Sequence, residues 1–317
     1  MRGTVSTKLA PFLQQVNIAI KDAKANNIAF APEIIRANLD NLSALLGDGP
    51  QVSVVADKQL HCEGQNIAVR VYHPAPDKKL PVLLHFHGGG HMCGSIDLYD
   101  PISRRLAIAC QCIVICVEYR LAPEHPYPAG INDCQQALLH YRQALTDMNY
   151  GEKIYILGDS AGGAICTTLT MNSVTNPAIK IDKQILIYPG VDYTMSFASM
   201  DENGQGFLLE KDKVHWYFQQ YFQTQNLTDE RIKKASPLFA PFNANMPETL
   251  VFSGGCDPLK DEAFAYVKAL KNVGVNVEHQ HFDGMIHAYM LLHYLVVDEC
   301  EQTYQSIANF INNKQKA

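Results

Sequence analysis

The chain has 317 residues, of which 47% are apolar, so it can bury a large core and is not disordered. Its 26 basic and 32 acidic residues give a net charge of -6 without charge runs, which argues against nucleic-acid binding and a polybasic membrane anchor. Because no apolar stretch reaches the length of a signal-peptide core at the N-terminus, or of a membrane helix elsewhere, we expect a cytoplasmic protein without stable membrane insertion.

The first ~45 residues carry apolar side chains at helical spacing, interrupted by Pro11 and Pro32. This spacing predicts short amphipathic helices that cover the rest of the protein. From residue 51, the alternating stretches QVSVVADKQLHC and QNIAVRVYHP flank Gly64, which predicts an antiparallel pair of strands.

Beyond residue 80 the pattern changes to short apolar runs that alternate with segments of helix length. The runs are PVLLHFH, CIVICVEY, KIYILG, KQILIYPG, TLVFSGG and NVEHQHFDG. Continuous apolar runs indicate strands buried on both faces, and their alternation with helices predicts a parallel sheet with right-handed crossovers. We therefore expect a single α/β domain over residues 1–317, with a mostly parallel eight-stranded sheet flanked by helices.

A stretch of about 40 residues between YPGVDYT and ASPLF departs from this rhythm. With the N-terminal helices, it predicts a helical cap formed by about residues 1–45 and about residues 191–235. Five aromatic side chains follow a helical spacing within the stretch: Trp216, Tyr217, Phe218, Tyr221 and Phe222. Two interpretations are open, because such side chains either pack into a core or line a binding pocket as part of a lid.

The nine cysteines are odd in number and lie largely in apolar runs, as small buried side chains do in a reducing compartment. This distribution argues against disulfides. Cys110, Cys112 and Cys116 are candidate metal ligands, but they share one strand-like run with no Cys or His pair at zinc spacing. A core position is the favoured interpretation for all three.

The motif GDSAGG, residues 158–163, lies between the apolar run KIYIL and a stretch compatible with a helix. Open α/β sheets carry their chemistry beyond the carboxyl ends of the strands. Ser160 stands at such an end, where G-x-S-x-G forms a nucleophile elbow, a strained turn that exposes the serine hydroxyl. The pattern alone is a weak signal, since tight strand-to-helix turns need glycine anyway, but its context makes Ser160 the candidate nucleophile.

A serine nucleophile also needs a base, a group that orients the base, and donors for the developing oxyanion. HFHGGGH follows the first buried strand and contains three glycines in a row, Gly88, Gly89 and Gly90. The alternative is a flexible turn, but three consecutive glycines are costly in backbone entropy. We expect an oxyanion hole here, completed by the N–H of Ala161.

The acid is expected after the seventh strand, where TLVFSGGCDPLKDEAF offers Asp257, Asp261 and Glu262. Because Pro258 suits a first helical position, a helix N-cap is the structural alternative for Asp257. Asp257 is also the one candidate of the three on the loop itself. His287 follows the eighth strand and completes the order Ser–Asp–His at successive strand ends, which the other histidines do not.

The proline-rich loop YRLAPEHPYPAG follows the second buried strand. Its prolines restrict the backbone, so a structural role is favoured over a catalytic one. We expect an internal ion pair between Arg120 and Glu124 to support the loop.

Five motifs occur in a fixed order along the chain: HGGG, YRLAPEHPYPAG, GDSAGG, DPLKDE and GMIH. Together they resemble the hormone-sensitive-lipase-like family of α/β-hydrolase carboxylesterases, over roughly residues 60–310. The resemblance implies an α/β-hydrolase fold, acyl esters of short to medium chain as substrates, and no metal or organic cofactor. The site residues that it implies are Ser160, Asp257 and His287 as the catalytic triad, and Gly88, Gly89 and Ala161 as oxyanion donors.

The chain departs from the pattern of this family at two places. His91, Met92 and Cys93 follow the three glycines, where relatives usually carry an aromatic or aliphatic residue, so the pocket wall is expected to differ there. HAY stands where HGF is common, and Tyr289 is expected to preserve the aromatic packing.

Hydrolysis of small acyl esters is the favoured function, with no nucleic acid as a partner and a homodimer left open. An amidase, deacetylase or lactonase would use the same triad. A non-catalytic ligand-binding module on the same fold is the alternative from another class. The intact Ser160, Asp257 and His287 favour an enzyme over the binding module.

Overall fold

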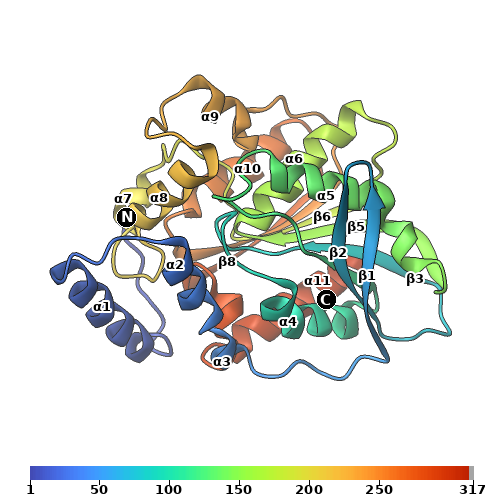
Figure 1. Ribbon diagram of the computed structural model, residues 1–317, viewed down its shortest axis with the longest axis horizontal. Coiled ribbons are helices and arrows are strands. Elements are labelled where there is room, and N and C mark those ends of the chain that lie inside the picture. The colour runs from blue at the N-terminus through green and yellow to red at the C-terminus, as the bar shows by residue number, and fades with distance from the viewer. Residues whose placement is uncertain (314–317) are drawn as a thin grey trace.

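An eight-stranded sheet runs through the centre of the protein, in a computed structural model that describes residues 1–313 (Figure 1). The strand order is β1-β2-β4-β3-β5-β6-β7-β8. The strands are β1 Val54–Cys62, β2 Gln65–His73, β3 Leu80–Phe86, β4 Ile113–Val117, β5 Tyr150–Asp159, β6 Lys183–Ile187, β7 Glu248–Cys256 and β8 Val277–Ile286. The pairs β1–β2 and β2–β4 are antiparallel and the others are parallel, which confirms the mostly parallel eight-stranded sheet.

The central strands are buried on both faces because their side chains alternate between two apolar cores. On β3, Leu83 belongs to one core, and Val82 and Leu84 belong to the other. Every residue of β4 and β6 is buried, as their continuous apolar runs predict.

Helices cover both faces of the sheet and separate the two cores from solvent. The flanking helices are α4 Ile96–Cys110, α5 Ala129–His140, α6 Ala161–Thr175, α10 Lys260–Asn272 and α11 Val297–Ile311. In Figure 1, α4 and α11 lie below the sheet, and α5, α6 and α10 lie above it. Short 3₁₀ helices complete these layers: η1 Tyr141–Leu145, η2 Pro237–Phe239 and η3 Tyr289–Leu292.

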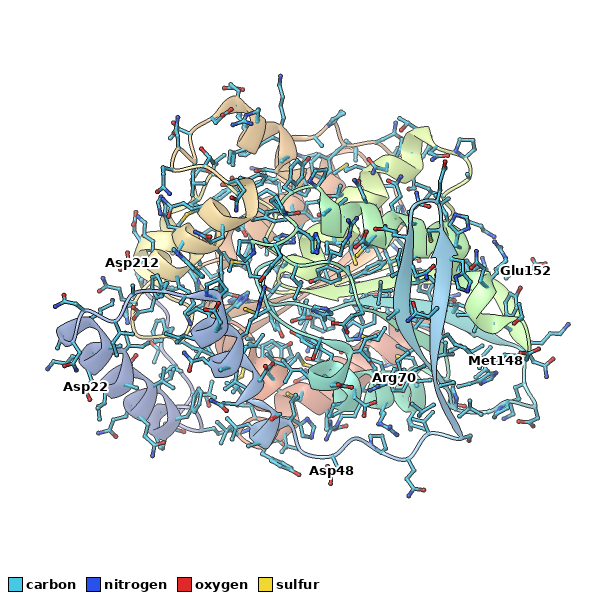
Figure 2. All side chains as sticks on the ribbon, in the orientation of Figure 1. Asp22, Asp48, Arg70, Met148, Glu152 and Asp212 are labelled. Carbon is cyan, nitrogen blue, oxygen red and sulfur yellow. The ribbon has the colours of Figure 1, made fainter. Side chains whose placement is uncertain are left out.

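Two segments far apart in the sequence lie side by side at one end of the sheet (Figure 1). The N-terminal segment, residues 1–46, contains α1 Ala10–Ala25, α2 Pro32–Asp40 and α3 Ser43–Leu46; the insert, residues 191–235, contains α7 Ala198–Glu202, α8 Lys211–Phe222 and α9 Glu230–Ala235. Lys24 Nζ donates a hydrogen bond to Glu210 at 2.8 Å, which joins α1 to the residue before α8. Figure 2 accordingly shows Asp22 of α1 and Asp212 of α8 at the same end of the molecule.

Proline positions in the N-terminal segment differ in one respect from the expectation. Pro32 is the first residue of α2, but Pro11 lies in the first turn of α1 and does not interrupt a helix. The first turn tolerates proline because its N–H groups have no partner within the helix.

The nine cysteines are all free, and all but Cys62 are buried. Cys110, Cys112 and Cys116 belong to one of the two apolar cores, as their favoured interpretation requires. None of the helices within residues 1–313 combines the length and apolar character needed to cross a bilayer.

The expected ion pair between Arg120 and Glu124 is wrong. Arg120 pairs with Asp133 of α5, with Nη2 2.7 Å from Oδ1, and its backbone N–H donates to the same carboxylate at 2.9 Å. Glu124 pairs instead with Arg36 of α2. Arg120 and Glu124 thus each pair with a residue of a helix that packs against the loop, and not with each other.

Candidate active site

Ser160 lies on a sharp turn between β5 and α6. Its φ of 53° and ψ of -118° fall outside the conformations that non-glycine residues usually adopt. Such strain persists only when surrounding structure holds it, and here Ser160 N–H donates to Ile187 O at 2.9 Å. A Cβ atom at Gly162 would lie 1.9 Å from the carbonyl oxygen of Phe86, so the close approach of α6 to β3 requires glycine.

Ser160, His287 and Asp257 form one continuous hydrogen-bonded chain, although they follow three different strands. His287 Nε2 lies 2.8 Å from Ser160 Oγ, and His287 Nδ1 lies 2.8 Å from Asp257 Oδ2. His287 and Asp257 are 4% and 1% exposed, which shields the contact between them from water, whereas Ser160 faces the cavity. The structure thus brings together all three residues of the predicted triad.

Asp257 faces His287 and is not the N-cap of α10, because that helix begins at Lys260 and Leu259 is its N-cap; the structural alternative for Asp257 is therefore wrong. Oδ1 accepts the N–H of Leu259 at 2.7 Å at the start of α10, while Oδ2 faces His287. This contact within the turn before α10 fixes the orientation of the carboxylate toward the imidazole. Because a carboxylate accepts hydrogen bonds, the proton of neutral His287 is held on Nδ1, and the Nε2 lone pair faces the serine hydroxyl.

Tyr188 and Tyr289 support the loop that carries His287. The Tyr188 ring packs against the imidazole with centroids 4.8 Å apart and against Tyr289 at 5.3 Å. Tyr289 is fully buried and its hydroxyl bonds to Thr303 at 2.8 Å, so the expected aromatic packing after the histidine is present. Ala288 has a φ of 61°, a left-handed conformation that glycine adopts more easily.

The glycine turn, residues 88–93, reaches the site from the end of β3. Gly88 N–H donates to Asp159 Oδ1 at 2.8 Å, so the prediction that Gly88 donates to an oxyanion is wrong. Gly89 and Gly90, with φ of 119° and 63°, line the same cavity as Ser160 and Ala161. Within residues 1–313, the N–H groups of Gly89, Gly90 and Ala161 donate no hydrogen bond.

Asp159 is a buried carboxyl group that no sequence argument assigned, although it precedes Ser160 within GDSAGG. Burial raises the pKa of Asp159 to about 6, against the opposing effect of hydrogen bonds from Tyr99 and Gly88. Tyr99 Oη donates to Oδ2 at 3.0 Å, and Tyr188 Oη lies 3.4 Å from the same oxygen. Asp159, which directly precedes Ser160, therefore links the end of β5 to the glycine turn.

Asp159→Asn is expected to make the free energy of unfolding less dependent on pH. Since the pKa is raised from 3.8 to about 6, the Asp159 contribution to stability is full below pH 3.8 and is lost as pH rises through about 6. That loss corresponds to about 3 kcal/mol, and the neutral asparagine, which can still accept the Gly88 N–H, should escape it. Urea unfolding at about pH 4 and about pH 7 measures the free energy of unfolding of both proteins. An equal change in this free energy between the two pH values for the parent and for Asp159→Asn would contradict the expectation.

A cavity of about 940 Å³ leads from Ser160 and His287 to the N-terminal segment and the insert. Its volume lies at the upper end for small-molecule sites. Apolar side chains of α1, α2 and α8 form much of its wall, among them Phe12, Ile20, Ile35, Leu39, Trp216 and Phe218. Of the aromatic series on α8, Trp216 and Tyr217 line the cavity, whereas Tyr221 packs in a buried apolar cluster, so the series contributes both to a pocket wall and to a core.

Comparisons with known proteins show the family of this chain. A family described by the alpha/beta hydrolase fold matches residues 83–291. Carboxylesterase NlhH of Mycobacterium tuberculosis is 33% identical over 250 residues, 77% of each chain, and ethyl acetate hydrolase of Pseudomonas putida is 30% identical over 297 residues, 90% of this chain and 92% of the relative. The solved structure of the Pyrobaculum calidifontis esterase is similar with a TM-score of 0.84 at 30% identity, covering 98% of each chain.

These matches, which extend over the sheet, the elbow and the histidine loop, confirm the resemblance carried by the five sequence motifs. The chain therefore belongs to the hormone-sensitive-lipase-like family of α/β-hydrolases and is a carboxylic ester hydrolase.

Proposed function

We propose that this carboxylic ester hydrolase acts through an acyl-serine intermediate on Ser160, with His287 as base and Asp257 as the acid that orients it. The observation that carries the proposal is the pair of 2.8 Å contacts that His287 makes with Ser160 Oγ and Asp257 Oδ2. An imidazole held between these two groups can take a proton on one nitrogen while the carboxylate stabilises the resulting charge.

Acylation begins when Ser160 Oγ attacks the ester carbonyl and its proton moves to His287 Nε2. Negative charge then develops on the former carbonyl oxygen. In this proposal the N–H groups of Gly89, Gly90 and Ala161 receive that oxygen; the corrected set is supported by their positions on the cavity wall and by the Asp159 contact of Gly88. Protonated His287 then gives its proton to the leaving alcohol.

Deacylation repeats these steps with water as the nucleophile. His287 Nε2 removes a proton from water as the water oxygen attacks the acyl-serine carbonyl. The carboxylic acid product leaves when the Ser160 oxygen recovers the proton from His287. One histidine thus serves both half-reactions, because its Nδ1 stays bonded to Asp257 throughout.

In our proposal, a cap covers this site and consists of about residues 1–45 and about residues 191–235. Their support is that α1, α2 and α8 supply apolar wall to the cavity that contains Ser160. Apolar walls of this kind suit an uncharged acyl group, which gains by leaving water. In this proposal the cap binds the acyl group of the substrate, and the triad catalyses hydrolysis of the ester.

Short- to medium-chain acyl esters are the proposed substrates, and a series of p-nitrophenyl esters from acetate to palmitate tests them. The Pseudomonas relative is an ethyl acetate hydrolase, which supports the short end of this range. We expect kcat/KM to be highest for an acyl chain of about four to eight carbons, each buried methylene contributing about 0.8 kcal/mol until the apolar wall is filled. A maximum at palmitate would contradict the proposed chain length.

Amide bonds are the main competing substrate class, because an amidase uses the same nucleophile and base. A matched pair, the p-nitrophenyl ester and the p-nitroanilide of the same acid, separates the two activities. We expect hydrolysis of the ester only, at a rate that falls with Ser160→Ala. Faster cleavage of the anilide would assign the site to amides.

A further inference from the structure

The glycine turn holds an unusual run of backbone conformations. Gly89, Gly90 and His91 have φ of 119°, 63° and 61° in succession. His91 is not a glycine, so its left-handed conformation is strained and needs support from surrounding groups. The position of the proposed oxyanion donors at Gly89 and Gly90 depends on that support.

Part of the support comes from groups packed around His91. Its carbonyl oxygen accepts the N–H of Ala122 at 2.9 Å, and its Nε2 lies 3.0 Å from Tyr193 Oη. The imidazole also stacks on Tyr221 of α8, with ring centroids 4.0 Å apart and an angle of 4°. These contacts hold the side chain and one carbonyl of the turn.

The next carbonyl of the turn is held by Arg36, which comes from α2 of the N-terminal segment. Arg36 Nε donates to Met92 O at 2.8 Å, and Nη2 donates to Ala122 O at 3.0 Å. Nη1 and Nη2 also donate to the carboxylate of Glu124, at 2.9 and 2.6 Å. A planar guanidinium can make all these bonds at once, so it links α2, the glycine turn and the proline-rich loop.

Both carbonyls depend on this arginine. Within residues 1–313, Met92 O and Ala122 O accept no other hydrogen bond, and Met92 is fully buried. Loss of Arg36 would leave them unpaired, and a buried unpaired carbonyl is a strong reason for the backbone to move. The bond to Glu124 matters less, since that carboxylate is 53% exposed and water competes for it.

We propose that Arg36 is a positioning residue for ester hydrolysis, which keeps Gly89 and Gly90 aimed at the oxyanion while α2 is docked. Arg36 is not among the residues that line the cavity within the described part of the chain, so it acts through the turn and not on the substrate. The N-terminal segment thereby contributes to the rate of the reaction as well as to the binding of the acyl group. This inference rests on the function proposed above.

The test is steady-state kinetics of Arg36→Met with p-nitrophenyl butyrate, expressed per active site titrated with a fluorophosphonate. We expect kcat per titrated site to fall by about 10- to 100-fold, because a displacement of the oxyanion donors by about 1 Å has an effect of this size. This loss is smaller than the loss of about 100- to 1,000-fold that follows removal of a whole donor. KM should change by less than about threefold, since the acyl wall is intact. Arg36→Lys, which can still reach one carbonyl, should lose less than Arg36→Met.

Arg105→Met is the matched control. Arg105 of α4 also bonds backbone carbonyls of the N-terminal region, Leu46 O at 3.2 Å and Asp48 O at 3.0 Å, but within residues 1–313 it makes no hydrogen bond to the glycine turn. Its kcat per titrated site should stay within about twofold of the parent. Glu124→Gln removes the ion pair and leaves the carbonyl bonds, so a loss of at most about threefold is expected.

Two results would overturn the role of Arg36 while the proposed function stands. One is an Arg36→Met enzyme with fewer titratable sites but a normal kcat for each, which would show a purely structural role. The other is a Glu124→Gln enzyme that loses as much as Arg36→Met, which would place the effect in the ion pair. If Arg36→Met does not fold, Arg36→Lys carries the test in its place: lysine can hold one of the two carbonyls and leaves the other unpaired, so kcat per titrated site should still fall by more than about threefold, and a normal value would overturn the inference. An inactive parent protein would instead overturn the proposed function itself.

Discussion

Ser160→Ala is expected to lower kcat for ester hydrolysis by about four to six orders of magnitude while the protein remains folded. Alanine lacks the one atom that attacks the ester, and a water molecule must replace it without the positioning that the chain provides. The rest of the site persists, because the turn is held by backbone contacts such as Ser160 N–H to Ile187 O at 2.9 Å. The residual rate should come from the oxyanion donors and from substrate binding.

The matched control for this variant is Ser173→Ala. Ser173 lies on α6, the helix that begins directly after Ser160, and its hydroxyl bonds only to the carbonyl of Thr170 at 2.7 Å among the described residues. We expect full activity from it. Circular dichroism and thermal unfolding should be the same for both variants as for the parent. A Ser160→Ala enzyme that keeps more than about a tenth of its turnover would exclude Ser160 as the nucleophile.

Asp257→Asn is expected to lower kcat by about four orders of magnitude through the tautomer of His287. In the parent, the carboxylate accepts the Nδ1 proton at 2.8 Å and leaves the Nε2 lone pair facing Ser160. An amide that bonds Leu259 N–H through its oxygen turns its NH₂ toward His287. Nδ1 must then accept, Nε2 carries the proton, and the histidine can no longer act as a base.

Asp261→Asn separates this effect from general changes at the start of α10. Asp261 is the competing acid in the same sequence segment, but its Oδ2 accepts the N–H of Ser199 at 3.0 Å, and among the described residues it makes no hydrogen bond or ion pair with His287. We expect its kcat to stay within about threefold of the parent. Equal losses in the two variants would show that the helix start, and not the carboxylate beside His287, controls the rate.

The sheet and the triad could be predicted from sequence because each rests on local pattern and chain order. Continuous apolar runs indicate strands buried on both faces, and the chemistry of an α/β sheet lies beyond the carboxyl ends of its strands. Ser160, Asp257 and His287 follow β5, β7 and β8 in the order that this chemistry uses, although β8 is an edge strand and only partly buried. Knowledge of the strands was therefore sufficient to bring residues together that are as much as 127 positions apart.

The oxyanion donors could not be selected in this way. Gly88, Gly89 and Gly90 are equivalent in the sequence, and which N–H faces the cavity depends on a contact between the glycine turn and the end of β5. Asp159, 71 positions away, accepts the N–H of Gly88 and so removes it from the set. The sequence indicates only that Asp159 lies beside the nucleophile, whereas its contact with the N–H of Gly88 appears only in the three-dimensional structure.

The contacts of the charged side chains were also beyond the reach of local spacing. Arg120 and Glu124 lie in one loop, yet each finds its partner on a helix, Asp133 on α5 and Arg36 on α2. Nothing in the pattern around Arg36 marks it as the partner of Met92, which lies 56 positions away. Such pairs form when helices and loops pack against one another, so they depend on the tertiary structure and not on the local sequence around either partner.

Covalent labelling with a fluorophosphonate, followed by mass spectrometry of the intact chain and its peptides, tests most directly that Ser160 is the activated nucleophile. We predict one label per chain, carried by the peptide with Ser160, with loss of ester hydrolysis in proportion to labelling. Ser160→Ala should remain unlabelled, and Asp257→Asn should be labelled far more slowly. A label on a different residue that abolishes activity, or full activity in a chain labelled at Ser160, would contradict the mechanism.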